Sequence, residues 1–268
     1  MLTPTTRLVL CTLLSLCLVF NASANDSDQV NCNHAWKIAV LGSSTAFGTG
    51  ASAYDSSWVG KYSAYLIRKN SNNIVYNLGI PGFTSYQNLC PTGFTAPANR
   101  PAVNSNFNIT AALALHPDAL IINMPSNDAA NNYTVAEQQS NFERAIHLAD
   151  SANVPVWVTT TQPRNNLNAA EISSLMAMRD WINTRFGDKA VDFWSTVSNA
   201  DGTISPFYDY DYVHVNNQGH ELFYERMKAE TILDSLCARV TQTLVAKAGP
   251  DRSITLPLNT VTLDGSAS

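Results

Sequence analysis

Short apolar runs with the length of β-strands alternate along this chain with longer segments that have the period of an α-helix. The strand-like runs are rich in β-branched residues and lie at residues 36–41, 74–78, 119–124, 154–160 and 190–193. A strand, a helix and a further strand in succession form a βαβ unit, whose two strands pair in parallel. The pattern therefore predicts the α/β class, and we expect a three-layer α/β/α sandwich with a mostly parallel central sheet.

The helical segments each have one apolar face. This spacing is found in residues 58–69, 142–149 and 175–182, and a last helical stretch is predicted from 218 to 247. In open α/β sheets, ligands bind beyond the carboxyl ends of the strands. We therefore expect functional residues in the loops after the first three strands, which are rich in Gly, Ser, Asn and Pro and comprise residues 42–57, 79–101 and 125–134.

The composition supports one sizeable core and excludes several classes of partner. Hydrophobic residues make up 45% and charged residues 14% of the 268-residue chain, as in an ordinary globular protein. The formal net charge is -5, so the chain lacks the basic surface that nucleic acid or an anionic membrane requires. We expect neither as a partner.

The N-terminus has the pattern of a secretory signal peptide. Arg7 precedes an apolar run over residues 8–20, and Ala22, Ser23 and Ala24 follow as a small-residue cleavage site. An uncleaved membrane anchor is the alternative, but the apolar run is short for a membrane span. We expect residues 1–24 to be removed and the mature protein to be periplasmic or extracellular, with no membrane association after cleavage.

Three cysteines, Cys32, Cys90 and Cys237, remain after the expected cleavage. Three thiols in an oxidising compartment permit one disulfide and one free thiol. Neither the cysteines nor the five histidines have the spacing of a metal site, so no metal is predicted.

Ser44 lies where the first strand ends, after Gly42 and Ser43, and is a candidate nucleophile. One alternative is that Ser43 or Ser44 only caps the next helix. Another is dinucleotide binding, because residues 48–53 fit a permissive Gly-x-Gly-x-x-Ala pattern, although this pattern lies well beyond the strand end.

A serine becomes nucleophilic when a base accepts its proton and a third group orients that base. Asp211 and His214 have the spacing for this, because a carboxylate three residues away in a tight turn reaches the imidazole Nδ1. Donors for a developing oxyanion are also present: the backbone N–H of Gly82 and the side-chain amide of Asn127 each follow a predicted strand. Taken alone, each of these residues fits an ordinary turn equally well.

Taken together, the blocks at Gly42-Ser43-Ser44, Gly82, Asn127 and Asp211-x-x-His214 occur in the order found in the SGNH (GDSL-type) hydrolases, and the chain resembles that family from about residue 36 to 246. The resemblance implies Ser44 as nucleophile, His214 as base and Asp211 as its orienting group. It also implies an oxyanion hole formed by Ser44, Gly82 and Asn127, with no metal or organic cofactor.

Two residues depart from the family pattern. Ser43 stands where the family usually has Asp, and Pro125 stands where a Gly commonly opens the block that carries Asn127. The departures concern the hydrogen bonding behind Ser44 and the geometry of the Asn127 loop.

The resemblance implies a secreted serine ester hydrolase that acts through an acyl-enzyme, and we expect acetyl or other short acyl groups on carbohydrate as its substrate. The expected partner is thus a small ester or an acylated polysaccharide. A lipase or lysophospholipase is the alternative within the enzyme class, and a non-catalytic carbohydrate-binding or adhesion module on the same scaffold is the alternative outside it. Acyl length, the alcohol or sugar, and the oligomeric state stay open.

The expected catalytic domain comprises residues 25–247, and the composition changes at Ala248. Residues 248–268 resemble the opening of a PKD-like immunoglobulin-type repeat, so we expect the truncated start of a second module that contributes nothing to catalysis. Cys32 precedes the first strand and Cys237 lies in the last helix, elements that pack together in such sheets. We therefore predict a Cys32–Cys237 disulfide and a free Cys90.

Overall fold

The computed structural model describes residues 32, 34–124 and 126–242. The expected signal peptide, the repeat-like segment from residue 248 and Pro125 lie outside these residues. In the described ranges, no helix combines the length and the apolar character needed to cross a membrane.

The centre of the domain is a sheet of five strands in the order β2-β1-β3-β4-β5, with every neighbouring pair parallel. The strands are β1 (Lys37–Gly42), β2 (Ile74–Gly79), β3 (Ala119–Asn123), β4 (Val156–Thr159) and β5 (Ala190–Val191). The predicted α/β class with a parallel sheet is confirmed. The last strand is shorter than expected, because the side chain of Asp192 accepts hydrogen bonds from the N–H groups of Trp194 and Ser195 and turns the chain out of the sheet.

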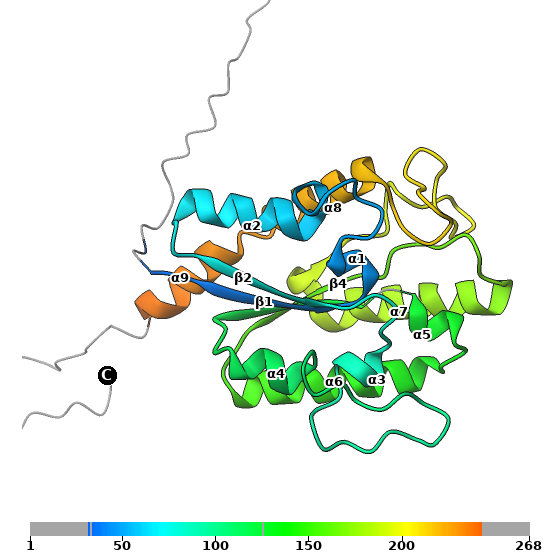
Figure 1. Cartoon of the computed structure of the whole chain (residues 1–268), viewed down its shortest axis with the longest axis horizontal. Coiled ribbons are helices and arrows are strands. Elements are labelled where there is room, and N and C mark those ends of the chain that lie inside the picture. Colours follow the sequence, from blue (N-terminus) through cyan, green and yellow to red (C-terminus); the bar gives the residue numbers. More distant parts are fainter. Residues whose placement is uncertain (1–31, 33, 125, 243–268) are drawn as a thin grey trace, which may run out of the picture. The chain divides into compact units, whose positions relative to one another are not determined.

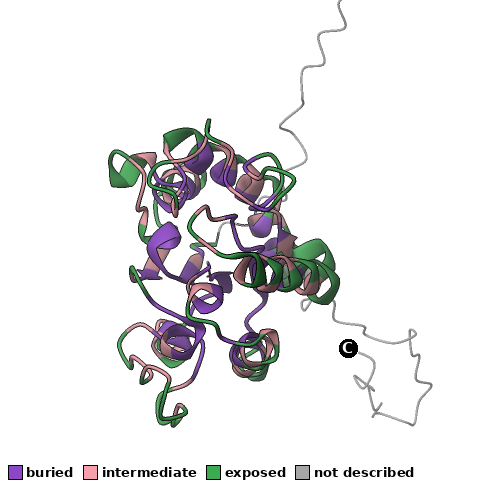
Figure 2. Ribbon diagram, turned by 90° about the vertical axis from the view of Figure 1, so that its right-hand side faces the viewer, coloured by how far each residue is buried: buried purple, intermediate pink, exposed green. Residues whose placement is uncertain are grey.

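Helices cover both faces of the sheet (Figure 1). One face packs against α2 (Trp58–Lys69), α8 (Asn217–Ala229) and α9 (Ile232–Gln242). The other packs against α4 (Ile109–Ala114), α6 (Val135–Ser151) and α7 (Ala169–Phe186). Buried residues gather in the sheet and on the sides of the helices that face it (Figure 2).

The central strand β1 contributes to both halves of the core because successive side chains of a strand point to opposite faces. Ile38 and Val40 pack with the cluster that includes Trp58, whereas Ala39 and Leu41 pack with the opposite cluster. All four β1 side chains are fully buried. A strand covered on both faces reads as a continuous apolar run, and this explains the sequence pattern that predicted the sheet.

The stretch predicted to be helical from residue 218 to 247 is helical as far as it is described, to residue 242, but it is not continuous. The chain forms α8 and α9 with a break between them at Glu230 and Thr231. Thr231 has φ of 45°, a left-handed conformation that a β-branched residue rarely adopts and that ends the helix. The change of direction lets Ile232 and Leu236 of α9 enter the core.

The predicted Cys32–Cys237 disulfide is present and links the segment before β1 to α9, with 5.8 Å between the Cα atoms. Cys90 is the free thiol among the described residues and is buried. Burial raises the pKa of Cys90 to about 11, so this thiol stays protonated and unreactive at neutral pH.

Candidate active site

Three loops that carry candidate residues meet at the carboxyl edge of the sheet. Ser44 follows β1, Gly82 follows β2 and Asn127 follows β3, and these three strands are neighbours in the order β2-β1-β3. Because the strands are parallel, their carboxyl ends lie at one edge. The sheet therefore places side by side three residues that are far apart in the sequence.

Ser44 is the first residue of the short helix α1 (Ser44–Phe47), which begins directly after β1. The turn is tight: a Cβ at Gly42 would lie 2.8 Å from the carbonyl oxygen of Asn123 and even closer to Ala46. Ser43 occupies the N-cap position, but its side chain makes no capping hydrogen bond. Helix capping therefore does not explain this pair of serines.

His214 connects Ser44 to Asp211. The Nε2 atom of His214 lies 2.8 Å from the Ser44 hydroxyl, although 170 residues separate the two in the chain. The Nδ1 atom of the same ring lies 2.9 Å from the Asp211 carboxylate. A carboxylate at Nδ1 favours the tautomer with a proton there, which leaves Nε2 free to accept a proton from the hydroxyl.

The electrostatics of the pair suit this arrangement. Burial acts to raise the pKa of Asp211, but hydrogen bonds from the His214 ring and from the N–H groups of Val213 and His214 hold it below its ordinary value. Asp211 is therefore ionised at neutral pH. The Ser44 residue is only 6% exposed and the His214 side chain 14%. The proton donor, Ser44, and the proton acceptor, His214, are therefore both largely shielded from water.

Asn165, in the loop after β4, holds the segment that carries Asp211 and His214. Its N–H donates to the carbonyl of Tyr212 at 2.7 Å, and its side-chain amide donates to Asp209 at 2.8 Å. The N–H of Tyr210 donates to the carbonyl of His214 and closes the turn. These bonds hold the turn in addition to those that the Asp211 carboxylate accepts from the N–H groups of Val213 and His214.

Asn127 and the Gly82 loop also meet. The Nδ2 atom of Asn127 donates to the carbonyl of Phe83 at 2.8 Å and to the hydroxyl of Ser43 at 2.9 Å. Gly82 has φ of 81°, which favours glycine, and within the described part of the chain no acceptor is found for its N–H or for that of Ser44. In the described ranges, Ser44 and Gly82 thus each carry an N–H group without an acceptor, and such groups could serve as oxyanion donors.

The departure at Ser43 has a structural consequence. Its hydroxyl is fully buried behind Ser44 and accepts the Asn127 amide, so a neutral group holds Asn127 where the family usually has a carboxylate. The other departure, Pro125, lies outside the described residues.

Sequence analysis missed Asp128, whose carboxylate is buried and accepts hydrogen bonds from the N–H and the hydroxyl of Ser85. Burial raises the pKa of Asp128 to about 6, although the bonds from Ser85 act against this shift. An acidic residue inside a loop after a buried strand was the available sign, but only the fold reveals its partner.

It also missed Arg164, which lies in the loop after β4 and contacts the side-chain oxygen of Asn127 at 3.4 Å. Burial lowers the pKa of this guanidinium, and Asp211 and Glu171 act in the opposite direction. Functional residues were expected in the loops after the first three strands and at the Asp211–His214 turn, whereas Arg164 follows the fourth strand.

The remaining candidates have structural explanations. Gly48 ends α1 and Gly50 packs against the carbonyl of Val215, so no helix begins on the Gly-x-Gly segment and a phosphate site is not formed there. His220 is buried, where its Nδ1 accepts from Trp58 N–H and its Nε2 donates to the carbonyl of Thr49. Throughout the described ranges, no three His, Cys, Asp or Glu side chains are grouped to hold a metal ion.

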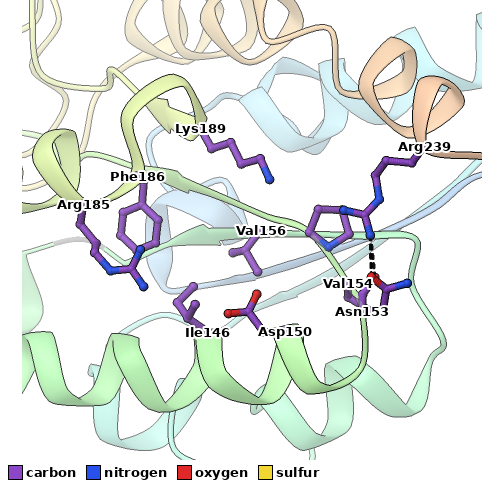
Figure 3. Close-up of a pocket in the computed structure, with 10 residues that line it drawn as sticks. Ile146, Asp150, Asn153, Val154, Val156, Arg185, Phe186, Lys189 and Arg239 are labelled. Atoms are coloured by element: carbon purple, nitrogen blue, oxygen red, sulfur yellow. Dashed lines mark hydrogen bonds between the residues drawn. The ribbon is translucent and has the colours of Figure 1, made fainter. Parts of the chain in front are cut away.

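An apolar cleft of about 650 Å³ lies beside α1. Its walls include the rings of Phe47, Tyr54 and Phe107 and the side chain of Ile80. A smaller pocket of about 230 Å³ lies around the start of β4 and contains none of the candidate site residues (Figure 3). The larger cleft is lined by Phe47, three residues after Ser44 in α1, and by none of the candidate site residues themselves.

A model of the GDSL-like lipase/acylhydrolase family matches residues 40–222, a range that includes Ser44, Gly82, Asn127, Asp211 and His214. The chain belongs to this family and is a carboxylic ester hydrolase. Among curated proteins, no sequence matches the chain.

Solved structures with this fold include several esterases. A lipolytic protein of the G-D-S-L family from Desulfitobacterium hafniense is 19% identical, with a TM-score of 0.54 over 72% of this chain and 98% of its own. An acylhydrolase from Bacteroides fragilis is 23% identical, with a TM-score of 0.54 over 75% and 88%. An acetylxylan esterase from Geobacillus stearothermophilus is 14% identical, with a TM-score of 0.55 over 73% and 93%. These likenesses establish the fold.

Proposed function

We propose that this member of the GDSL-like lipase/acylhydrolase family is a secreted serine esterase that removes acetyl or other short acyl groups from carbohydrate. The observation that carries the proposal is the ring of His214, which lies within hydrogen-bond distance of both the Ser44 hydroxyl and the Asp211 carboxylate. The proposed roles are nucleophile for Ser44, base for His214 and orienting group for Asp211.

In the first half of the reaction, the Ser44 oxygen attacks the ester carbonyl while its proton passes to His214 Nε2. The resulting imidazolium is stabilised by Asp211, which keeps its own negative charge. As the tetrahedral intermediate collapses, the bond between the carbonyl carbon and the alcohol oxygen breaks, and the proton on His214 passes to the departing alcohol. The acyl group is left on Ser44.

In the second half, His214 takes a proton from water, whose oxygen attacks the acyl carbon. The bond to the Ser44 oxygen then breaks, the proton returns to that oxygen, and the free acid leaves. The negative charge that develops on the carbonyl oxygen in each half faces the N–H groups of Ser44 and Gly82 and the amide of Asn127. For Asn127, this requires its Nδ2 to turn one N–H from Ser43 or Phe83 toward the substrate.

Carbohydrate as the carrier of the acyl group is supported by two sequence patterns and by one solved structure. The N-terminal pattern of a signal peptide and the repeat-like segment from residue 248 favour an extracellular substrate. The acetylxylan esterase from Geobacillus stearothermophilus shares the fold. A shared fold is an analogy for substrate, because one fold hosts many functions.

Hydrolysis of 4-nitrophenyl acetate by the purified protein and by Ser44→Ala tests the chemistry. We expect turnover that Ser44→Ala abolishes, and equal rates for the two proteins would favour a non-catalytic binding module. Release of acetate from acetylated xylan tests the substrate class. Turnover of 4-nitrophenyl acetate without acetate release from the polymer would reject the carbohydrate assignment while leaving the esterase intact.

The apolar cleft beside α1 favours a second candidate, an esterase for longer acyl chains. Phe47, which lies in the same short helix as Ser44, and Tyr54 line this cleft and are about half exposed, so an acyl chain that entered it would find apolar contacts. A series of 4-nitrophenyl esters from acetate to decanoate separates the two candidates. Highest kcat/KM for acetate supports the proposed function, and a maximum at eight or ten carbons supports the lipase alternative.

A further inference from the structure

Three large aromatic side chains are exposed on the loop that carries Asp211 and His214. Phe207 is 65% exposed, Tyr210 62% and Tyr212 68%, and we call these three the loop aromatics. Each such ring removes about 150–250 Å² from water when it is covered. Apolar rings clustered on one short loop of a soluble domain mark an interaction site more often than chance exposure does.

The backbone holds one of these rings in an unfavourable conformation. Tyr212 has φ of 69°, which bulky side chains rarely adopt. Its N–H donates to Asp209 at 2.7 Å and its carbonyl accepts from Asn165 N–H at 2.7 Å, so hydrogen bonds maintain the strained backbone. An exposed aromatic residue thus occupies a backbone conformation that a small polar residue would adopt more readily. Backbone strain of this kind is concentrated at functional sites.

The loop aromatics lie close to the reacting groups. Tyr210 and Tyr212 are the immediate neighbours of Asp211, about 3.8 Å from it between Cα atoms. The carbonyl of Phe207 accepts from the side chain of Asn216, which holds this end of the loop to the start of α8. A ligand that covers Tyr210 and Tyr212 therefore lies on the same turn as the carboxylate that orients His214.

We propose that the loop aromatics form a stacking platform for sugar rings of a polysaccharide, adjacent to the acylated sugar that enters the site. This inference rests on the proposed function and extends it from the ester to the chain that carries it. A pyranose ring has an apolar C–H face and a rim of hydroxyl groups. An aromatic ring covers such a face, and the tyrosine hydroxyls add hydrogen bonds at the edge.

The charges around the loop disfavour an anionic lipid surface as the occupant. No Lys or Arg occurs between Thr203 and Glu225, and Asp209 and Asp211 lie beside the rings. Arg164, a cation that interacts with Asp211, comes from the loop after β4 and is partly buried. Attraction to anionic headgroups requires Lys or Arg near the surface. A neutral glycan meets no such requirement, because its hydroxyl groups hydrogen-bond to carboxylates and to tyrosine alike.

The test compares one polymer with one small ester. In the double variant Phe207→Ala/Tyr210→Ala, we expect KM for acetylated xylan to rise about tenfold, or about 1.4 kcal/mol, because two stacking contacts with the sugar chain are lost. The kcat/KM for 4-nitrophenyl acetate should stay at the wild-type value, because this substrate has no sugar. Ile67→Ala, which removes a large apolar side chain that is 48% exposed on α2, is the control and should change neither value.

Binding of deacetylated xylan to Ser44→Ala, measured by affinity electrophoresis, tests the platform without turnover. We expect retardation that is lost when Phe207→Ala/Tyr210→Ala is added. Equal losses on polymer and small ester would instead indicate a structural role, and an unchanged KM for the polymer would overturn the platform. If the protein sediments with phosphatidylcholine vesicles and the double variant does not, the ligand of the platform is a lipid and not a glycan. If Ser44→Ala binds xylan but the wild type releases no acetate from the polymer, the platform stands and the proposed function fails.

Discussion

The carboxylate of Asp128 accepts hydrogen bonds from the backbone N–H and the hydroxyl of Ser85, and so joins the two loops that carry Gly82 and Asn127. Asn141 of α6 donates to the same Ser85 hydroxyl at 2.9 Å and completes a buried network. The relative position of the two proposed oxyanion donors therefore depends on a pair of residues that do not face the substrate.

Asp128→Asn should lower kcat by about tenfold to a hundredfold, because a misplacement of about 1 Å in a catalytic group has effects of this size. The side-chain N–H of the amide then faces the N–H and the hydroxyl of Ser85, which are donors too. A buried donor without an acceptor lowers the free energy of unfolding by about 1–3 kcal/mol. Steady-state kinetics and thermal melting measure both effects. Asp150→Asn, at an exposed position of α6, is the matched control. An unchanged kcat in Asp128→Asn would show that the link does not position the donors.

Ser44→Ala, His214→Ala and the double variant should have similar residual kcat, each about 10⁴ to 10⁶ below the wild type, because the two groups act as one unit. Asp211→Asn should retain more activity than His214→Ala, since the base is still present. Single-turnover assays with 4-nitrophenyl acetate resolve these low rates. Near wild-type turnover in His214→Ala would mean that another residue is the base.

Asn127→Ala should lower kcat by about 10² to 10³, or about 3–4 kcal/mol, with little change in KM, because an oxyanion donor acts mainly in the transition state. Its amide also bonds to Ser43, so Ser43→Ala separates the structural part of the effect. We expect a much smaller loss of kcat in Ser43→Ala. A rise in KM alone for Asn127→Ala would assign Asn127 to ground-state binding.

His220 should make the folded domain sensitive to mild acid. Burial is the main cause that lowers its pKa from 6.5 to about 4. The unfolded chain therefore binds the proton first as the pH falls, and the stability that neutral His220 provides above pH 6.5 is lost progressively toward pH 4.

Relative to His220→Gln, the free energy of unfolding of the wild type should fall by about 2 kcal/mol between pH 7 and pH 5. Urea titrations at the two pH values measure this difference. His147→Gln changes an exposed histidine of α6 and should show no such difference from the wild type. Parallel pH dependence in the wild type and His220→Gln would contradict the assignment.

Reduction of the Cys32–Cys237 disulfide should lower the stability by about 5 kcal/mol, because the bond closes a loop of 205 residues in the unfolded chain. Urea unfolding with and without dithiothreitol measures the effect. The variant Cys32→Ser/Cys237→Ser should match the reduced wild type and be insensitive to dithiothreitol. If dithiothreitol still lowered the stability of that variant, a disulfide formed by Cys90 would be indicated.

The sequence by itself determined those features that depend on local spacing. Short apolar runs of strand length, such as β1, and the helical period of α2 are local patterns, so the sheet class and the bounds of residues 58–69 were predicted. The spacing of Asp211 and His214 is likewise local, because three residues in a turn bring a carboxylate to an imidazole. The break between α8 and α9 at Thr231 was not predicted, because the helical spacing of apolar residues continues across it.

Only the tertiary structure decided which of these local features meet. Ser44 and His214 are 170 residues apart, and their 2.8 Å contact depends on the strand order and on the bonds from Asn165 that hold the turn. The partner of Asp128 and the contact of Arg164 with Asn127 depend on the same packing. Such contacts arise from the free energy of the whole core, which local periodicity and spacing do not encode.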